Sequence, residues 1–244
     1  MKLVVQVKLL PDAAQEAALW ESLKLCNTAA NHASRRAFET GVKAKAALQR
    51  PVYHEVKAMG LSAQPAIHCV RKVAGAYATL KANLKAGDYG DEGSKRRTRV
   101  EAAPVRFRKD AAQPFDDRCL SWRLDARTVS IWTVQGRRKG IAFVCSPEQA
   151  KMLSEYRQGE SDLVRRGNFF YLYATCEVPE AEEYTPQGFV GVDLGIANIA
   201  TTSDGTGGPR RPRLHLPGVF GVRPHCQEEP ARPGHLQMHV VRLR

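Results

Sequence analysis

The hydrophobic pattern of this chain changes its period near residue 100, and that change constrains the fold more than any other feature. Upstream, apolar residues recur at steps of three and four within residues 19–37 and 66–84, which is the spacing of one helix face. Downstream, apolar and polar residues alternate, as in strands, through residues 121–124, 128–134, 141–145 and 169–176. The pattern predicts an α+β chain.

The helical part carries its own start and stop signals. Residues 1–10 alternate and predict an opening strand. Asp12 with Gln15 three residues later resembles a capping box, and the helix that follows is predicted to end at Gly41. A second helix is predicted over about residues 62–86. Their alanine-rich seams predict close packing in a bundle.

The strands after residue 105 are joined by basic turns. Hairpin turns are predicted at residues 135–140, which contain Arg137, Arg138 and Lys139, and at residues 165–168. These features predict a small β-barrel of the oligonucleotide-binding type, with one short helix beginning at Ser146-Pro147. Five aromatic residues either stack on bases or fill the core: Trp122, Trp132, Phe169, Tyr171 and Tyr173.

A glycine-rich and then basic stretch, residues 87–99, separates the helices from the barrel. We expect a mobile loop there. Lys95, Arg96 and Arg97 either contact phosphate groups or are solvated linker residues.

The positive charge lies in the first 178 residues. The chain has a net charge of +12, and residues 1–178 hold 30 Lys and Arg against 18 Asp and Glu. A polyphosphate partner is expected through counterion release, although a positive surface also keeps a protein soluble.

Cysteine spacing and hydropathy exclude several classes of protein. The two closest of the six cysteines are 26 positions apart, so no Cys-x-x-Cys pair exists, and neither a zinc ribbon nor a disulfide framework is predicted. The opening residues are broken by Gln6 and Lys8, unlike a signal peptide. No apolar run approaches the about 20 residues of a membrane span, so no membrane partner is expected.

Residues 189–205, FVGVDLGIANIATTSDG, predict a strand, a tight turn at Gly195 and a second strand. Asp193 interrupts the first apolar run. A carboxylate in such a position meets a cation or hydrogen-bond donors, because an unpaired buried charge is costly. Asp193 is therefore either a metal ligand or a strand-end acid satisfied by backbone donors.

Four ordered blocks within residues 1–205 resemble the TnpB family, the transposon-encoded RNA-guided DNA nucleases also called OrfB-type transposases and related to type V CRISPR effectors. The blocks are GVDLGIANIATTSDG, CNTAANHASRRAFETG at 26–41, YHEVKAMGLSAQPAIHCVRKVAGAYATLKANLKAG at 53–87, and VRFRKDAAQPFDDRCLSW at 105–122.

The resemblance implies a layout and a set of contacts. Residues 1–10 would open a wedge β-barrel completed by residues 100–178, and residues 11–99 would be an inserted helical recognition lobe. A linker, 179–188, would lead to an RNase H-like RuvC nuclease domain that begins at 189–205. Barrel and helices would hold a guide RNA, and target DNA would touch a helical block in which each residue is otherwise an ordinary surface or helix-cap residue: Tyr53, Gln64, His68 and Lys72.

The sequence departs from the family where the chemistry is expected. RuvC-type cleavage uses two Mg²⁺ ions about 4 Å apart, which several carboxylates must hold. Beyond Asp204 the only acids are Glu228 and Glu229, without an apolar strand to position them. Residues 206–244 contain six prolines, seven arginines and no lysine. We expect a frameshifted tail or a genuine disordered one. Its histidines and Cys226 lack the spacing of a zinc finger.

The sequence therefore predicts a truncated TnpB-like protein of the prokaryotic cytoplasm that binds guide RNA, and target DNA, without cutting. Two alternatives stay open. In one, the chain is a working endonuclease or transposase accessory protein that holds Mg²⁺ with Glu228 or with ligands borrowed from another subunit; in the other, it has no biochemical role. The sequence does not specify an oligomeric state.

Overall fold

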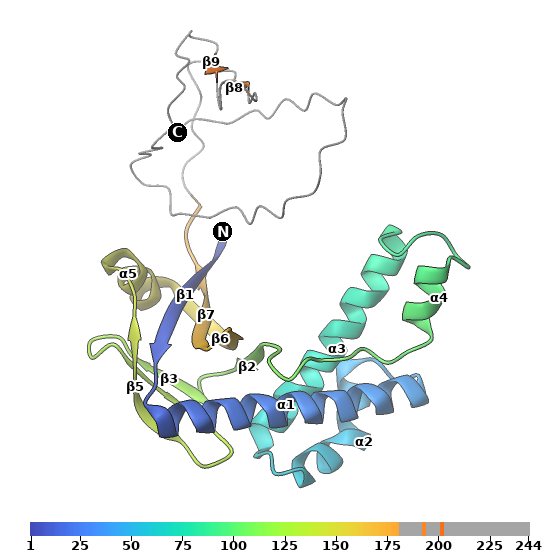
Figure 1. The fold of residues 1–244 in the computed structure, drawn as a ribbon, viewed down its shortest axis with the longest axis horizontal. Helices are drawn as coiled ribbons and strands as arrows, with labels where there is room; N and C mark the ends of the chain where they lie inside the picture. The colour runs from blue at the N-terminus through green and yellow to red at the C-terminus, as the bar shows by residue number, and fades with distance from the viewer. Residues whose placement is uncertain (181–191, 194–200, 203–244) are drawn as a thin grey trace. The chain divides into compact units, whose positions relative to one another are not determined.

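The computed structural model describes residues 1–180, 192–193 and 201–202. Residues Met1–Glu180 form one compact unit and Ala181–Arg244 a second. In the first unit the order is a strand, four helices and a run of strands interrupted by one helix (Figure 1). Its elements are β1 Lys2–Leu10, α1 Ala13–Thr40, α2 Lys45–Ala58, α3 Ala63–Ala86, α4 Lys95–Glu101, β2 Gln113–Phe115, β3 Leu120–Arg123, β4 Thr128–Ile131, β5 Arg138–Val144, α5 Pro147–Tyr156, β6 Arg157–Arg166 and β7 Phe169–Glu177.

The seven strands form one antiparallel sheet in the order β2-β6-β7-β1-β5-β4-β3. The two edge strands, β2 and β3, follow one another in the chain and are joined by the short connection Asp116–Cys119, which we call the barrel seam. This connection brings the edges together, and the sheet is a nearly closed barrel. Since β1 pairs with β7 and β5, the helices α1–α4 are inserted between strands of one barrel.

Local signals in the sequence correctly located the long helices. Asp12 and Gln15 form a reciprocal capping box at the start of α1, and Gly41 ends it in the left-handed conformation with φ 70°. Helix α3 begins after Ser62 and ends at Gly87, where φ is 82°. The opening strand, the short helix α5 and the turns before β5 and β7 also match the prediction.

Four elements differ from the prediction. The stretch 87–99, expected to be a mobile loop, contains the start of helix α4, capped by the Ser94 hydroxyl, which accepts from the backbone N–H of Arg97. Helix α2 was not predicted, because Pro51 lies inside it and its N-cap has no side-chain hydrogen bond. Strands β2 and β6 were also missed, since neither shows a clean alternation of apolar residues.

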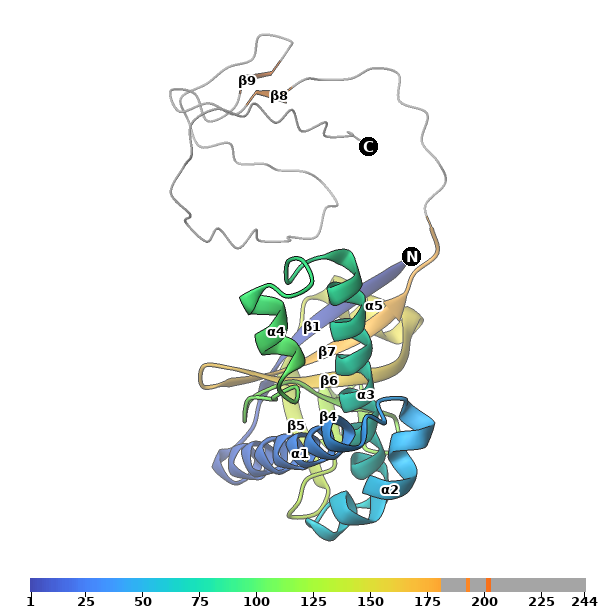
Figure 2. The ribbon, with the colours of Figure 1, turned by 90° about the vertical axis from the view of Figure 1, so that its right-hand side faces the viewer.

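Two apolar clusters lie in the first unit, one inside the barrel and one between helices. Helix α1 belongs to both: Leu19 and Leu23 enter the barrel cluster, whereas its later residues from Cys26 to Ala37 pack against α2 and α3. Trp132 packs against both clusters. Helix α1 therefore joins the barrel to the helical lobe, as Figure 1 shows, and Figure 2 shows α3 and α4 in front of the barrel strands.

In the second unit, strand β8, Val192–Asp193, pairs antiparallel with β9, Thr201–Thr202. This is the strand pair expected around Asp193. The linker, the turn at Gly195, the acids Glu228 and Glu229 and the tail lie outside the described residues. None of the helices described is both long and apolar enough to cross a membrane.

Candidate nucleic-acid interface

Residues 105–111 form a basic segment that leads from the helices to strand β2. A row of polar side chains on α1, which we call the ladder, binds the backbone of this segment. Ser34 donates to the backbone oxygen of Val105 at 2.7 Å. The Asn31 amide donates to the oxygen of Phe107 at 2.9 Å and accepts from its N–H at 2.8 Å. We call residues 105–111 the basic strap.

The ladder continues at Asn27. Its amide nitrogen donates to the backbone oxygens of Lys109 at 3.2 Å and Ala111 at 2.8 Å. Positions 27, 31 and 34 lie on one face of α1, and their partners are alternate residues of the strap, which ends in a turn where the Ala111 N–H donates to the backbone oxygen of Arg108 at 3.0 Å. The odd-numbered backbone groups are bound to the helix, while Arg106, Arg108 and Lys109 have exposed side chains. Sequence reasoning missed these three cations; its one available signal was the polar spacing within an otherwise alanine-rich seam.

Lys72, predicted to touch DNA, instead supports this ladder. Its ammonium group donates to Asn27 Oδ1 at 2.6 Å and lies 5.0 Å from the ring centre of Phe107. Burial lowers the pKa of Lys72 to about 8, and the nearby Asp162 carboxylate opposes that shift. Asp162, on β6, has a raised pKa because burial and Glu160 disfavour its charged form. The ammonium group of Lys72 therefore binds groups of the protein itself.

The outer face of the barrel presents three aromatic side chains in a row on β7. Buried and less buried residues alternate along this strand, with Phe170 and Leu172 in the core. Phe169, Tyr171 and Tyr173 therefore lie on the face opposite to the barrel core; Phe169 is 51% exposed, Tyr171 is half-buried, and the hydroxyl of Tyr173 is buried. The sequence left open whether the five aromatic residues stack on bases or fill the core. These three residues are not part of the barrel core, whereas Trp122 and Trp132 pack against it.

Cations from the neighbouring strands accompany these aromatic rings. The Lys8 ammonium on β1 lies 3.5 Å from the ring centre of Phe169, and the Arg166 guanidinium on β6 lies 5.3 Å from that of Tyr173. Directly paired residues of adjacent antiparallel strands share a face, and Lys8 is paired with Tyr171. We call Lys8, Arg166, Phe169, Tyr171 and Tyr173 the aromatic face.

The three cations of the β4–β5 turn differ in whether their side chains are hydrogen-bonded to the protein. Arg137 donates to Ser130 Oγ at 2.9 Å and to the backbone oxygen of Arg118 at 2.9 Å, so it braces the barrel seam. Arg138 donates to Gln135 Oε1 at 2.6 Å. Of these three cations, Lys139 alone has an exposed side chain without such a bond to the residues that the structure describes. Of this predicted cluster, Lys139 is best placed for a phosphate group.

On α4, Lys95 and Arg96 are exposed, and Arg96 lies 5.3 Å from the ring centre of Tyr89. Arg97 is partly buried and donates to Glu101 at 3.1 Å. These cations are carried by a helix and not by a structureless linker. Tyr53, on α2, packs partly buried against the helical cluster, where it contributes to the core.

Gln64 and His68 lie at the contact between α3 and the barrel seam. Gln64 donates to Asp116 Oδ2 at 2.6 Å and accepts from Arg118 at 3.2 Å. His68 is fully buried, and its Nε2 lies 3.5 Å from Asp116 Oδ2 and 3.8 Å from Glu160 Oε1. The neighbours of His68 in the structure are protein groups, and its contact with DNA stays a prediction.

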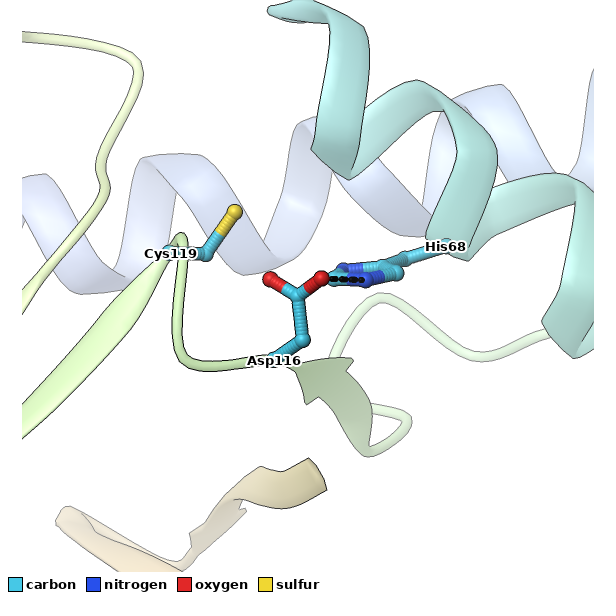
Figure 3. Close-up of side chains that lie close together, drawn as sticks. All are labelled: His68, Asp116 and Cys119. Atoms are coloured by element: carbon cyan, nitrogen blue, oxygen red, sulfur yellow. Dashed lines mark ion pairs between the residues drawn. The ribbon is translucent and has the colours of Figure 1, made fainter. Parts of the chain in front are cut away.

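Cys119 completes a cluster at this seam. The Asp116 carboxylate lies between the Cys119 thiol and the His68 ring (Figure 3). Burial, with Asp116 adding to it, raises the pKa of the Cys119 thiol to about 12. Burial also lowers the pKa of His68, against the opposing carboxylates, so its imidazole is neutral at pH 7. Sequence reasoning did not connect His68 with Cys119, because their proximity depends on barrel closure.

Comparison with protein-family models and with curated proteins gave no match for this chain. The observations that bear on function are therefore those of the molecule itself: a barrel with an inserted helical lobe, a partly exposed aromatic face accompanied by cations, and a basic strap bound to α1.

Proposed function

We propose that this protein binds RNA on the outer surface of its barrel, as the guide-holding part of a TnpB-like protein. The observation that carries the proposal is the aromatic face, where the exposed Phe169 and the half-buried Tyr171 lie beside Lys8 and Arg166. Proteins that hold single-stranded nucleic acids combine aromatic platforms for bases with cations that follow the backbone. An outward row of large aromatic side chains has no role in the barrel core.

The basic strap supports the electrostatic part of the proposal. Its backbone is bound by Asn27, Asn31 and Ser34, so the exposed Arg106 and Arg108 side chains extend from a fixed base. Holding the segment in place before binding lowers the entropy cost of fixing it on a ligand. Phosphate contacts of this kind give affinity without sequence preference. The same cations serve target DNA, which the resemblance adds as a second ligand.

We further propose that the protein does not cleave DNA. Two-metal phosphodiester cleavage needs several carboxylates around paired Mg²⁺ ions. In the described part of the chain, the group of potential metal ligands contains one carboxylate, Asp116, together with His68 and Cys119. Asp193 lies on β8 in the second unit, where the described residues are two short strands. The donor set within residues 1–180 does not suit a pair of Mg²⁺ ions.

The binding proposal is tested by removing two stacking platforms at once. We expect the double variant Phe169→Ala with Tyr171→Ala to bind a structured RNA with single-stranded loops about tenfold or more weakly than the wild type, since each stacked base contributes about 1–3 kcal/mol. Titration at low salt, followed by fluorescence anisotropy, measures the change. Val4, which is 64% exposed on β1, provides the matched control Val4→Ala.

Equal affinity of the double variant and Val4→Ala would contradict a role for the aromatic face. Far-ultraviolet circular dichroism and urea unfolding of each variant separate lost binding from lost structure. A DNA strand of the same sequence, run in parallel, shows whether the face discriminates between the two sugars.

A further inference from the structure

We propose that His68, Asp116 and Cys119 form a zinc site that ties the helical lobe to the barrel seam. Each residue offers one ligand atom, and these atoms all lie within 4.8 Å of one another. His68 comes from α3, whereas Asp116 and Cys119 stand at the two ends of the seam that joins β2 to β3 (Figure 3). One ion there would join elements that are far apart in the sequence.

The backbone holds two of the three ligands in place. The N–H groups of Cys119 and Leu120 donate to the backbone oxygen of Asp116, at 2.9 Å and 2.8 Å. The Trp132 N–H donates to the oxygen of Cys119 at 2.7 Å, which anchors the seam to the end of β4. Zinc binding would require side-chain rotations on this turn that bring the ligand atoms to about 2.0–2.3 Å from the ion.

The mixture of donor atoms selects the metal. An imidazole nitrogen, a thiolate sulfur and a carboxylate oxygen form a set that Zn²⁺ accepts in tetrahedral geometry. Mg²⁺ and Ca²⁺ require oxygen ligands, of which the group offers only Asp116. The site would therefore hold zinc, and it is distinct from the Mg²⁺ chemistry that the family resemblance implies for Asp193.

A nucleophilic role for Cys119 fits the geometry less well. The carboxylate of Asp116 separates the thiol from the His68 ring, so the base of a thiol–imidazole pair is not adjacent to the sulfur (Figure 3). Cys119 is 3% exposed, whereas reactive cysteines are accessible thiolates.

Charge balance favours an ion at this place. Zn²⁺ replaces the thiol proton: the S–H bond of Cys119 breaks, the proton passes to water, and the sulfur binds the metal. The thiolate and the Asp116 carboxylate then carry two negative charges against the two positive charges of the ion, and His68 binds as a neutral ligand. A buried assembly without net charge avoids the desolvation cost of an unpaired ion.

Neighbouring polar side chains contact the proposed site. Gln64 donates to Asp116 Oδ2 at 2.6 Å, and its amide nitrogen also lies 3.3 Å from His68 Nε2, so it contacts two of the three proposed ligands. Glu160, whose Oε1 lies 3.8 Å from His68 Nε2, is paired with Arg71. We therefore assign the fourth ligand to a water molecule and not to Glu160.

The test uses the full-length protein, stripped of metal with a chelator and titrated with Co²⁺ and then with Zn²⁺. A bound thiolate gives cobalt an intense near-ultraviolet charge-transfer band, which we expect to saturate at about one ion per chain. Cys119→Ser should abolish this band and His68→Asn should weaken Zn²⁺ binding by more than about tenfold. Zn²⁺ should raise the thermal midpoint of the wild type, because it binds the folded state.

Two matched cysteine variants identify the site. Cys145→Ser changes a partly buried barrel cysteine outside the group, and Cys226→Ser changes the cysteine that stands among the histidines of residues 206–244. Both should keep the cobalt band. Loss of the band in Cys226→Ser with retention in Cys119→Ser would overturn the proposal. The absence of both a cobalt band and a Zn²⁺-dependent thermal shift in the wild type would also overturn it, whatever the folding of the variants.

Discussion

The side chain of Asn31 pairs with the backbone of Phe107 as a neighbouring strand would. Its amide accepts from the Phe107 N–H at 2.8 Å and donates to the Phe107 oxygen at 2.9 Å. A segment without a strand partner thus has its backbone hydrogen bonds satisfied by a helix. The side chain of Asn31 on α1 therefore holds the basic strap in position.

Removing this pairing should destabilise the protein. We expect Asn31→Ala to lower the free energy of unfolding by about 2 kcal/mol, because it leaves both backbone groups of Phe107 without their partner. Urea unfolding measures the change. Asn83→Ala, at a partly exposed position of α3, is the matched control and should change little. Equal stabilities of the two variants would show that the ladder does not hold the strap.

The pKa of Lys72 predicts a pH dependence of stability. Its pKa is lowered from 10.5 to about 8 in the folded protein, so between these values the unfolded chain binds more protons. The contribution of Lys72 to stability therefore rises with pH through this window and is smallest below pH 8. Lys72→Met should remove that rise. Between pH 7.5 and pH 10, the unfolding free energy of the variant should therefore increase less, or decrease more, than that of the wild type.

Lys81, an exposed lysine of the same helix, provides the comparison for Lys72. Lys81→Met removes a positive charge from the same helix and leaves the contacts of Lys72 in place, so the pH dependence of the wild type should remain. Cysteines and tyrosines titrate in all three proteins, so only the difference between the variants is interpreted. An unchanged pH dependence in Lys72→Met would mean that the ammonium is well solvated.

The basic strap predicts a change in the salt dependence of RNA binding. Arg106→Gln with Arg108→Gln should reduce the slope of log K against log salt by about 1.4, since each phosphate contact contributes about 0.7 for a single strand. The affinity is measured across a salt series. Arg50→Gln with Lys57→Gln removes two exposed cations from α2 and should leave the slope near that of the wild type. A reduction confined to the α2 pair would place the RNA elsewhere.

Our proposal on catalysis predicts no cleavage. With Mg²⁺ or Mn²⁺ and a bound guide RNA, the wild type should leave target DNA intact, and Asp193→Ala should not change that result. Gel analysis of labelled DNA provides the measurement. Guide-dependent cutting by the wild type that Asp193→Ala abolishes would instead establish the endonuclease alternative, with carboxylates from beyond the described residues.

Features set by short stretches of the chain were predictable. The capping box of Asp12 and Gln15 and the positive φ of Gly41 depend on residues within one turn, so a sequence pattern is enough to place the ends of α1. Helix α2 was missed because its stability comes from burying Leu48, Val52 and Val56 against other helices, which outweighs its internal Pro51.

Strand β6 was missed for a related reason. Its sequence, RQGESDLVRR, has few apolar residues, and its extended form depends on pairing with β7 from Ser161 to Arg166. Propensity is a weak guide where a neighbouring strand supplies the hydrogen bonds. On β7, by contrast, the alternation was predictable, although only the folded barrel shows that Phe169, Tyr171 and Tyr173 occupy the outer face.

By itself, the sequence determined the order of helix and strand, the ends of the long helices and the concentration of positive charge in residues 1–178, because each depends on neighbours in the chain or on composition. Tertiary structure alone decided which polar residues meet. Barrel closure brings Asp116 and Cys119 to His68, and α1 brings Asn31 to Phe107. Such contacts join residues separated by tens of positions, and only the burial of two apolar clusters brings those positions together.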